Sequence, residues 1–213
     1  NAATPGVITS DVALTGLNNA TEVLIGIDFR PATGQLFSIA SDGTTDRVVT
    51  IDPTTGAVTN VGVTRPSLGE LFYGFDFNPV VDRLRVVGFG GSNRRFNPND
   101  GALAGTDTNL AYAPGDPGAG TSPNVVHIAY DRNNPGGVAT TLFGIDSGRD
   151  TLIRIGGVDG NPSPNGGQLF TVGPLGFNAN SFGGFDIQGG SNNAYAVIRT
   201  PGVSSLYTVN LST

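Results

Sequence analysis

The stretch GIDFRPATGQLF, residues 26–37, decides how the chain is interpreted. A short β-prone run ends in Gly-x-Asp, a Pro-x-x-Gly turn follows, and a second apolar run begins. Pro presets φ at the first turn position and the closing Gly tolerates positive φ, so the stretch predicts two strands joined by a tight reversal. The same cadence returns as YGFDFNPVVDRLRV at residues 73–86, which indicates a repeat.

Four copies of the pattern align on an Asp that follows a small residue. They are IGID (25–28), YGFD (73–76), IAYD (128–131) and GGFD (183–186). Each is followed by a turn and a second strand, and the clearest copies add a third and a fourth. Four strands in a repeat of about 50 residues are typical of β-propeller blades. We therefore expect an all-β, single-domain propeller over 1–213, with four-stranded antiparallel blades at about 22–63, 71–113, 124–173 and 181–213 plus 5–17.

The two ends of the sequence complement each other. The last repeat stops at SLYTVNLST, and the N-terminal NAATPGVITSDVALTG resembles DPTTGAVTNVG, which follows a third strand in the first repeat. This similarity predicts that the N-terminal segment closes the last blade and removes an exposed sheet edge. The alternative is that it closes a blade of a neighbouring molecule, a head-to-tail contact that builds fibres. Without closure, the chain would be an incomplete five-bladed ring.

Composition narrows the range of partners. Charged residues make up 13% of the 213 residues, the formal net charge is -6, and all 11 basic residues are Arg. Such a chain has little to neutralise phosphates, which argues against nucleic acid as a partner. There is no Cys, so neither disulfides nor thiolate chemistry contributes. No apolar run approaches the ~18 residues that a membrane span needs, so we expect no membrane insertion.

The small residue and the Asp of each repeat share one face of the predicted inner strand, because strand residues alternate faces. The small residue leaves room for the neighbouring blade. The Asp has two interpretations. The favoured one is structural: it accepts hydrogen bonds from free backbone N–H groups where the strand turns. In the other, the four carboxylates ring the channel mouth and hold Ca²⁺ through oxygen ligands. The candidate metal ligands are Asp28, Asp76, Asp131 and Asp186.

Catalysis finds little support in the sequence. His127 is the only His and lies on a predicted inner strand, where we interpret it as a satisfied core residue. No Ser lies in a nucleophile-elbow context. We assign no catalytic residue and no cofactor other than the candidate Ca²⁺. A lactonase-like propeller hydrolase that uses a channel metal is the enzymatic alternative. A lectin-like propeller is another, with Tyr73, Tyr112 and Tyr130 as candidate stacking groups.

Several segments together resemble a family of secreted bacterial proteins described only as a domain of unknown function. They are GIDFRPATGQLF, YGFDFNPVVDRLRVV, RRFNPNDGAL, TTLFGIDS and GGFDI with the later AYAVI and SLYTVNL. The resemblance covers nearly the whole chain and implies export and a propeller-like β fold. Because the sequence begins with Asn, we also expect that a signal peptide has been removed. It implies no activity, cofactor or catalytic residue. Family members extend further at both ends with strands that would complete a fifth blade, so both four and five blades are open.

These observations predict a secreted, non-enzymatic binding or structural module at the cell surface or in the matrix. Low charge, turn-rich composition and open-looking termini favour self-association through the terminal strands, including filament formation. A glycan or another surface component is the other candidate partner.

Overall fold

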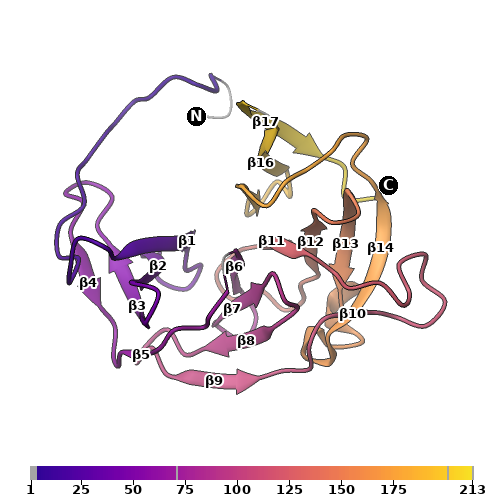
Figure 1. Cartoon of the computed structure of the whole chain (residues 1–213), viewed down its shortest axis with the longest axis horizontal. Coiled ribbons are helices and arrows are strands. Elements are labelled where there is room, and N and C mark those ends of the chain that lie inside the picture. Colours follow the sequence, from indigo (N-terminus) through magenta and orange to yellow (C-terminus); the bar gives the residue numbers. More distant parts are fainter. Residues whose placement is uncertain (1–3, 71, 201, 213) are drawn as a thin grey trace.

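The structure, a computed structural model, describes residues 4–70, 72–200 and 202–212. Within these ranges four small antiparallel sheets stand in a ring, which Figure 1 shows from above. This arrangement confirms the predicted β-propeller and gives it four blades. The only helical turns in the described part are two short 3₁₀ turns, Val158–Gly160 and Pro164–Gly166. Neither they nor any other described segment forms a helix long and apolar enough to cross a bilayer.

The first two sheets are built from consecutive strands. The first contains β1 (Val23–Phe29), β2 (Leu36–Ser41), β3 (Thr45–Ile51) and β4 (Val58–Asn60), with the short β5 (Arg65–Pro66) also paired to β3. The second contains β6 (Tyr73–Asn78), β7 (Arg83–Gly88), β8 (Asn93–Phe96) and β9 (Leu103–Thr106).

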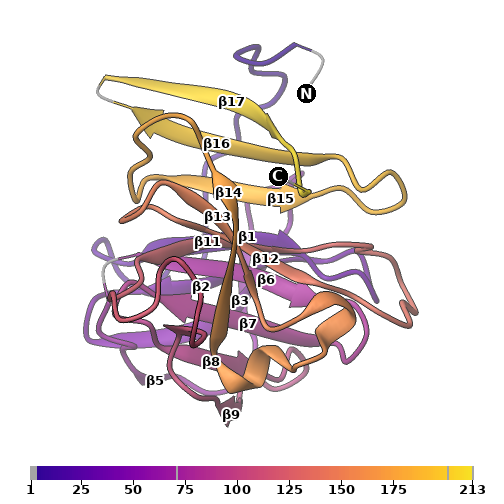
Figure 2. The same cartoon turned by 90° about the vertical axis from the view of Figure 1, so that its right-hand side faces the viewer.

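The last two sheets differ in strand number. The third contains β11 (Val125–Tyr130), β12 (Leu142–Asp146), β13 (Thr151–Ile155) and β14 (Gln168–Pro174), with β10 (Ala111–Tyr112) added in parallel to β14. The fourth contains β15 (Gly183–Ile187), β16 (Ala194–Thr200) and β17 (Val203–Val209). Figure 2 shows these three strands stacked at one end of the molecule.

The core lies between neighbouring sheets. The inner strands pack in succession, β1 on β6, β6 on β11 and β11 on β15. Between the first two sheets the rings of Phe37 and Phe77 meet edge to face with centroids 5.2 Å apart. Separate apolar clusters join the second sheet to the third and the third to the fourth. Among the described residues no buried cluster joins the fourth sheet back to the first.

The N-terminal segment 5–17 does not form the predicted closing strand. In the described part the last sheet ends at β17. Thr15 instead bridges Ala57 in parallel, donating its N–H to Gly56 O (3.0 Å) and accepting from Val58 N (2.8 Å). β10 lies in the same way beside β14 of the blade that it leads into. A segment on its way to an inner strand passes the outer edge of its own blade, and backbone groups there can pair with it.

The small residues of the inner strands make room for the next blade, as predicted, at two of these positions. A Cβ on Gly74 would lie 3.0 Å from Ile128 Cγ1 on β11. A Cβ on Gly26 would lie 2.7 Å from Phe75 Cβ on β6, and Gly26 also has φ near 87°. Gly184 differs, since a Cβ there would meet nothing within 4 Å. The inner strands of the first three blades therefore approach one another closely at these glycines. No such close approach exists at Gly184 of the fourth blade.

We expect Gly74→Ala to lower the free energy of unfolding by about 1–3 kcal/mol, because the added methyl forces β6 and β11 apart. Gly184→Ala is the matched control and should change it by less than about 0.5 kcal/mol, because the space beside it is open. Urea unfolding of the two variants measures the difference. Equal losses would contradict this account of inner-strand packing.

Candidate functional site in the central cavity

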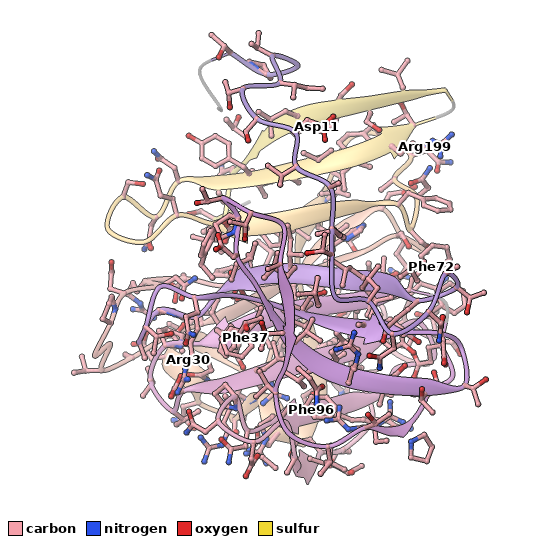
Figure 3. All side chains as sticks on the ribbon, turned by 90° about the vertical axis from the view of Figure 1, so that its left-hand side faces the viewer. Asp11, Arg30, Phe37, Phe72, Phe96 and Arg199 are labelled. Atoms are coloured by element: carbon pink, nitrogen blue, oxygen red, sulfur yellow. The ribbon has the colours of Figure 1, made fainter. Side chains whose placement is uncertain are left out.

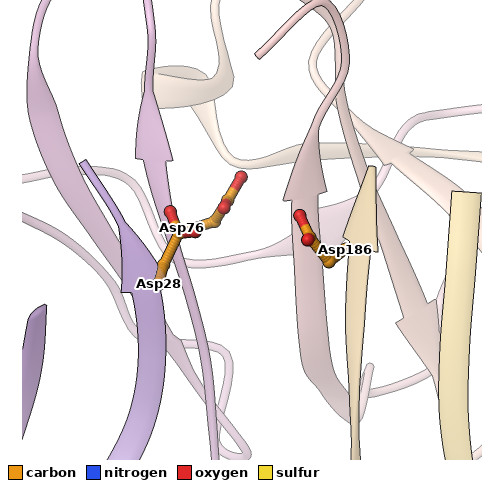
Figure 4. Close-up of side chains that lie close together, drawn as sticks. All are labelled: Asp28, Asp76 and Asp186. Carbon is orange, nitrogen blue, oxygen red and sulfur yellow. The ribbon is translucent and has the colours of Figure 1, made fainter. Parts of the chain in front are cut away.

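Three of the four predicted aspartates converge where the inner strands meet. Asp28 on β1, Asp76 on β6 and Asp186 on β15 each bring a carboxylate oxygen within 4.8 Å of the other two. Figure 4 shows Asp28 and Asp76 side by side, with Asp186 facing them from the opposite strand. Asp76 is buried, Asp28 is half-buried and Asp186 is exposed.

Two of these carboxylates connect neighbouring blades. Asp28 Oδ2 accepts a hydrogen bond from Phe77 N (2.8 Å), and Asp76 Oδ2 accepts one from Tyr130 N. Each therefore crosses to the inner strand of the next blade. The predicted structural role was a local bond at the end of the same strand, whereas these bonds hold adjacent blades together.

Asp131 lies outside this group because the third repeat is offset by two residues. Its N–H bonds to Thr141 O at the mouth of its hairpin, which is the place that Arg30 takes in the first blade. Two residues earlier, where the other blades carry Asp, the third blade has Ala129. The motif IAYD matches the small-x-Asp pattern in the wrong register, so sequence alignment could not detect the shift.

Asp131 has the local role that was predicted for all four. Its Oδ1 accepts from Thr141 N (2.6 Å) and from the Thr140 hydroxyl (3.2 Å), across the hairpin that β11 and β12 form. It also pairs with Arg132 at 3.1 Å. These bonds tie down the end of the strand and leave this carboxylate away from the central cluster.

Burial and mutual repulsion raise the pKa values of the clustered acids. Burial raises the pKa of Asp28 to about 6, and the nearby charge of Asp186 adds to the effect. Burial, then the charge of Asp28 and a hydrogen bond with it, raise the pKa of Asp76 well above its ordinary range. Partial desolvation of its carboxyl group also raises the pKa of Asp186, although the residue as a whole is exposed. Ionising both of two adjacent carboxyl groups costs free energy, because the two negative charges repel each other. Asp28 and Asp76 therefore share a proton in mild acid.

The carboxyl groups open into a cavity of about 430 Å³ between the inner strands. Its wall is mostly apolar and includes several aromatic side chains. These are Phe29, Tyr73, Phe75, Phe185 and Tyr195. The cavity therefore combines a cluster of carboxyl groups with aromatic walls.

His127 lines the same cavity, in the position that glycine holds in the other blades. It is 5% exposed, and its Nε2 atom has no hydrogen-bond partner among the described residues. Its ring does hydrogen-bond to the backbone of Asn180, while burial lowers its pKa to about 4. At neutral pH it is thus an uncharged imidazole with one unsatisfied nitrogen. The sequence led us to expect a core residue whose polar atoms all have hydrogen-bond partners. Only the two-residue offset of the third repeat could have indicated that His127 lines the cavity.

The three tyrosines proposed for glycan stacking separate into two groups. Tyr130 is buried and its hydroxyl accepts from Arg85 Nε (2.7 Å), and Tyr112 is buried with its hydroxyl donating to Asp146 (2.6 Å). Neither presents a free ring face. Tyr73 alone among the three lines the cavity.

The chain belongs to the family described as a domain of unknown function (DUF4394), whose model matches residues 1–213. No curated protein shows significant sequence similarity to it. Among solved structures, the glutaminyl cyclase of Myxococcus xanthus is similar, with a TM-score of 0.52 and 14% sequence identity over 90% of this chain and 75% of that one. A likeness at this identity shows a shared fold and leaves activity open.

The pH dependence of stability tests the acid cluster. Because the pKa of Asp28 is about 6 in the folded chain against an ordinary 3.8, its stabilising contribution is complete below pH 3.8 and is lost as the pH rises through about 6. His127 acts oppositely, since a pKa lowered from 6.5 to about 4 stabilises the fold at higher pH. We therefore expect Asp28→Asn to gain stability relative to the unmodified chain as the pH rises from 3.8 to about 6.

Urea unfolding at several pH values across this window measures that difference while the His127 effect cancels. Asp11→Asn, on the exposed N-terminal segment, is the control and should show a constant difference. A constant difference for Asp28→Asn as well would show that its carboxyl is not perturbed.

Proposed function

We propose that the protein is an extracellular structural module that assembles head to tail, with the N-terminal segment of one copy completing the last blade of the next. The observation that carries this proposal is the open edge of β17. Its sheet has three strands in the described part, while the other sheets have four or five. The family resemblance to secreted bacterial proteins supports the extracellular location.

The β17 edge can accept a strand. β17 spans seven residues, Val203–Val209, and pairs on one side with β16. An edge strand presents a row of unpaired N–H and C=O groups, which is a template for an added strand. In the described part no bulge interrupts the pairing of β17 with β16. The edge is therefore long and regular enough to bind an extended segment.

The N-terminal segment has the properties of a donor strand. Its apolar side chains are exposed, with Val7 at 59%, Ile8 at 81% and Leu14 at 44%. GVITSDVAL is rich in β-branched and other apolar residues, and it resembles AVTNVG around β4. Figure 3 shows the part around Asp11 on the outside of the molecule, crossing from the last sheet toward the first. These exposed apolar residues would gain burial on a sheet edge.

A second copy is the occupant that we favour. Thr15 anchors the segment on the first blade, and no backbone hydrogen bond joins the described residues before it to β17 of the same chain. A strand given to the next copy creates a heterologous contact that repeats without closing. Such a contact yields fibres, which suits a surface or matrix component.

Deletion of the N-terminal segment and substitution within it both test its proposed role as a donor strand. We expect removal of residues 1–14, or Ile8→Asp, to shift the protein from large assemblies to monomers, because the donor strand is lost or carries a charge into a sheet. Val138→Asp is the matched control, since Val138 is 94% exposed on a loop elsewhere and should leave assembly unchanged. Light scattering and electron microscopy measure particle size. A strictly monomeric unmodified chain at high concentration would refute the proposal.

A cation-dependent hydrolase is the second candidate, and the convergence of three carboxyl groups in a cavity favours it. A carboxyl with a pKa of about 6 can exchange a proton near neutral pH, which general acid–base catalysis requires. Calcium-dependent hydrolysis of simple lactones or esters, lost in Asp76→Asn, would support it. No turnover of such substrates with calcium present would count against it.

A further inference from the structure

We propose that the central cavity binds a small organic cation, whose ammonium group contacts Asp28, Asp76 and Asp186 and whose apolar body lies against the aromatic wall. This inference is independent of assembly through β17. It rests on the acidic end of the cavity, on the composition of its walls and on the unsatisfied nitrogen of His127.

The acidic end matches the donors of an ammonium group. An alkylammonium ion has three N–H donors, and three carboxyl groups from three strands bring oxygens within 4.8 Å of one another. Phe77 N and Tyr130 N hold Asp28 and Asp76 in place before any ligand arrives. Hydrogen bonds between charged partners are the stronger kind, and preorganised acceptors lose little on binding.

The walls match an apolar body attached to that cation. Tyr73 and Phe75 lie on β6 with Asp76, and Phe185 lies on β15 with Asp186. All three aromatic residues line the cavity. Aromatic faces attract ammonium groups electrostatically and also pack against hydrocarbon. A volume near 430 Å³ falls within the range of small-ligand sites, about 300–1,000 Å³.

His127 supplies an independent sign that something polar belongs in the cavity. Its Nε2 atom is buried without a partner among the described residues, which is costly unless a ligand or water completes it. Burial favours the neutral imidazole, in which an unprotonated Nε2 is a hydrogen-bond acceptor. A second donor on the ligand, such as a hydroxyl or amide, would satisfy it.

A bare metal ion fits the cavity less well. Ca²⁺ takes about 6–8 oxygen ligands at close range. Asp28 Oδ2 and Asp76 Oδ2 already accept backbone N–H groups. Beyond the carboxyl groups the lining is largely aromatic and aliphatic. The chemistry of the walls therefore favours an organic cation over calcium.

Isothermal titration at about pH 8 tests the inference with three probes: benzylamine, benzyl alcohol and calcium chloride. At this pH Asp28 is ionised, because its pKa is about 6. We expect benzylamine to bind at least about tenfold more tightly than benzyl alcohol, since hydrogen bonds between charged partners are stronger than those between neutral groups. Asp186→Asn should weaken benzylamine by a similar factor.

Asp11→Asn and Asp131→Asn are the controls, each removing one negative charge outside the cavity, and both should retain benzylamine binding. Asp186 makes none of the bonds between blades that Asp28 and Asp76 make, so its variant should fold, and circular dichroism verifies this. Equal binding of the amine and the alcohol would overturn the proposal. So would equal weakening by Asp11→Asn, or calcium binding without amine binding.

Discussion

The hydrogen bonds that the Asp28 and Asp76 carboxylates accept from the backbone of the next blade determine how the ring is assembled. Each links an inner strand to the following one, first β1 to β6 and then β6 to β11. A carboxylate that accepts a backbone N–H deep in the ring must lie close to the axis. The same bonds that join the blades therefore bring acidic groups together and create the charged end of the central cavity.

The ring is not uniform around its axis. The third blade carries Ala129 where its neighbours have Asp, so it cannot make the same bond to the fourth. At the remaining junction a Cβ on Gly184 would meet nothing within 4 Å, whereas one on Gly74 would press against Ile128 of the next blade. Among the residues that the structure describes, buried apolar packing joins the fourth blade to the third and not to the first. Both proposals involve the fourth blade, because the β17 edge belongs to its sheet and Asp186 on β15 is one of the three clustered carboxyl groups.

The sequence was sufficient to predict the architecture. Turn chemistry at residues 30–35 and 78–83 places two strands in each of the first two blades, and period-2 alternation orients their faces. The small residue before Asp was correctly explained at Gly26 and Gly74. The third repeat was misaligned because Ala129 and Asp131 form a small-x-Asp pattern of their own. The prediction placed the N-terminal segment on the wrong blade. Its similarity to β4 shows that it can form a strand, but it does not show which strand it pairs with.

Local physical chemistry is what the sequence by itself determined: which runs extend, where the chain reverses, and that the product is a ring of antiparallel blades. Those properties depend on φ preferences and on alternation within a few residues. Only the tertiary structure decided that Asp28, Asp76 and Asp186 meet while Asp131 does not, and that His127 faces their cavity. A shift of two residues in one hairpin preserves the face of every side chain. The shift does change which residues reach the axis. Turn chemistry is encoded within a few consecutive residues, whereas the distance between residues of different blades depends on the whole ring.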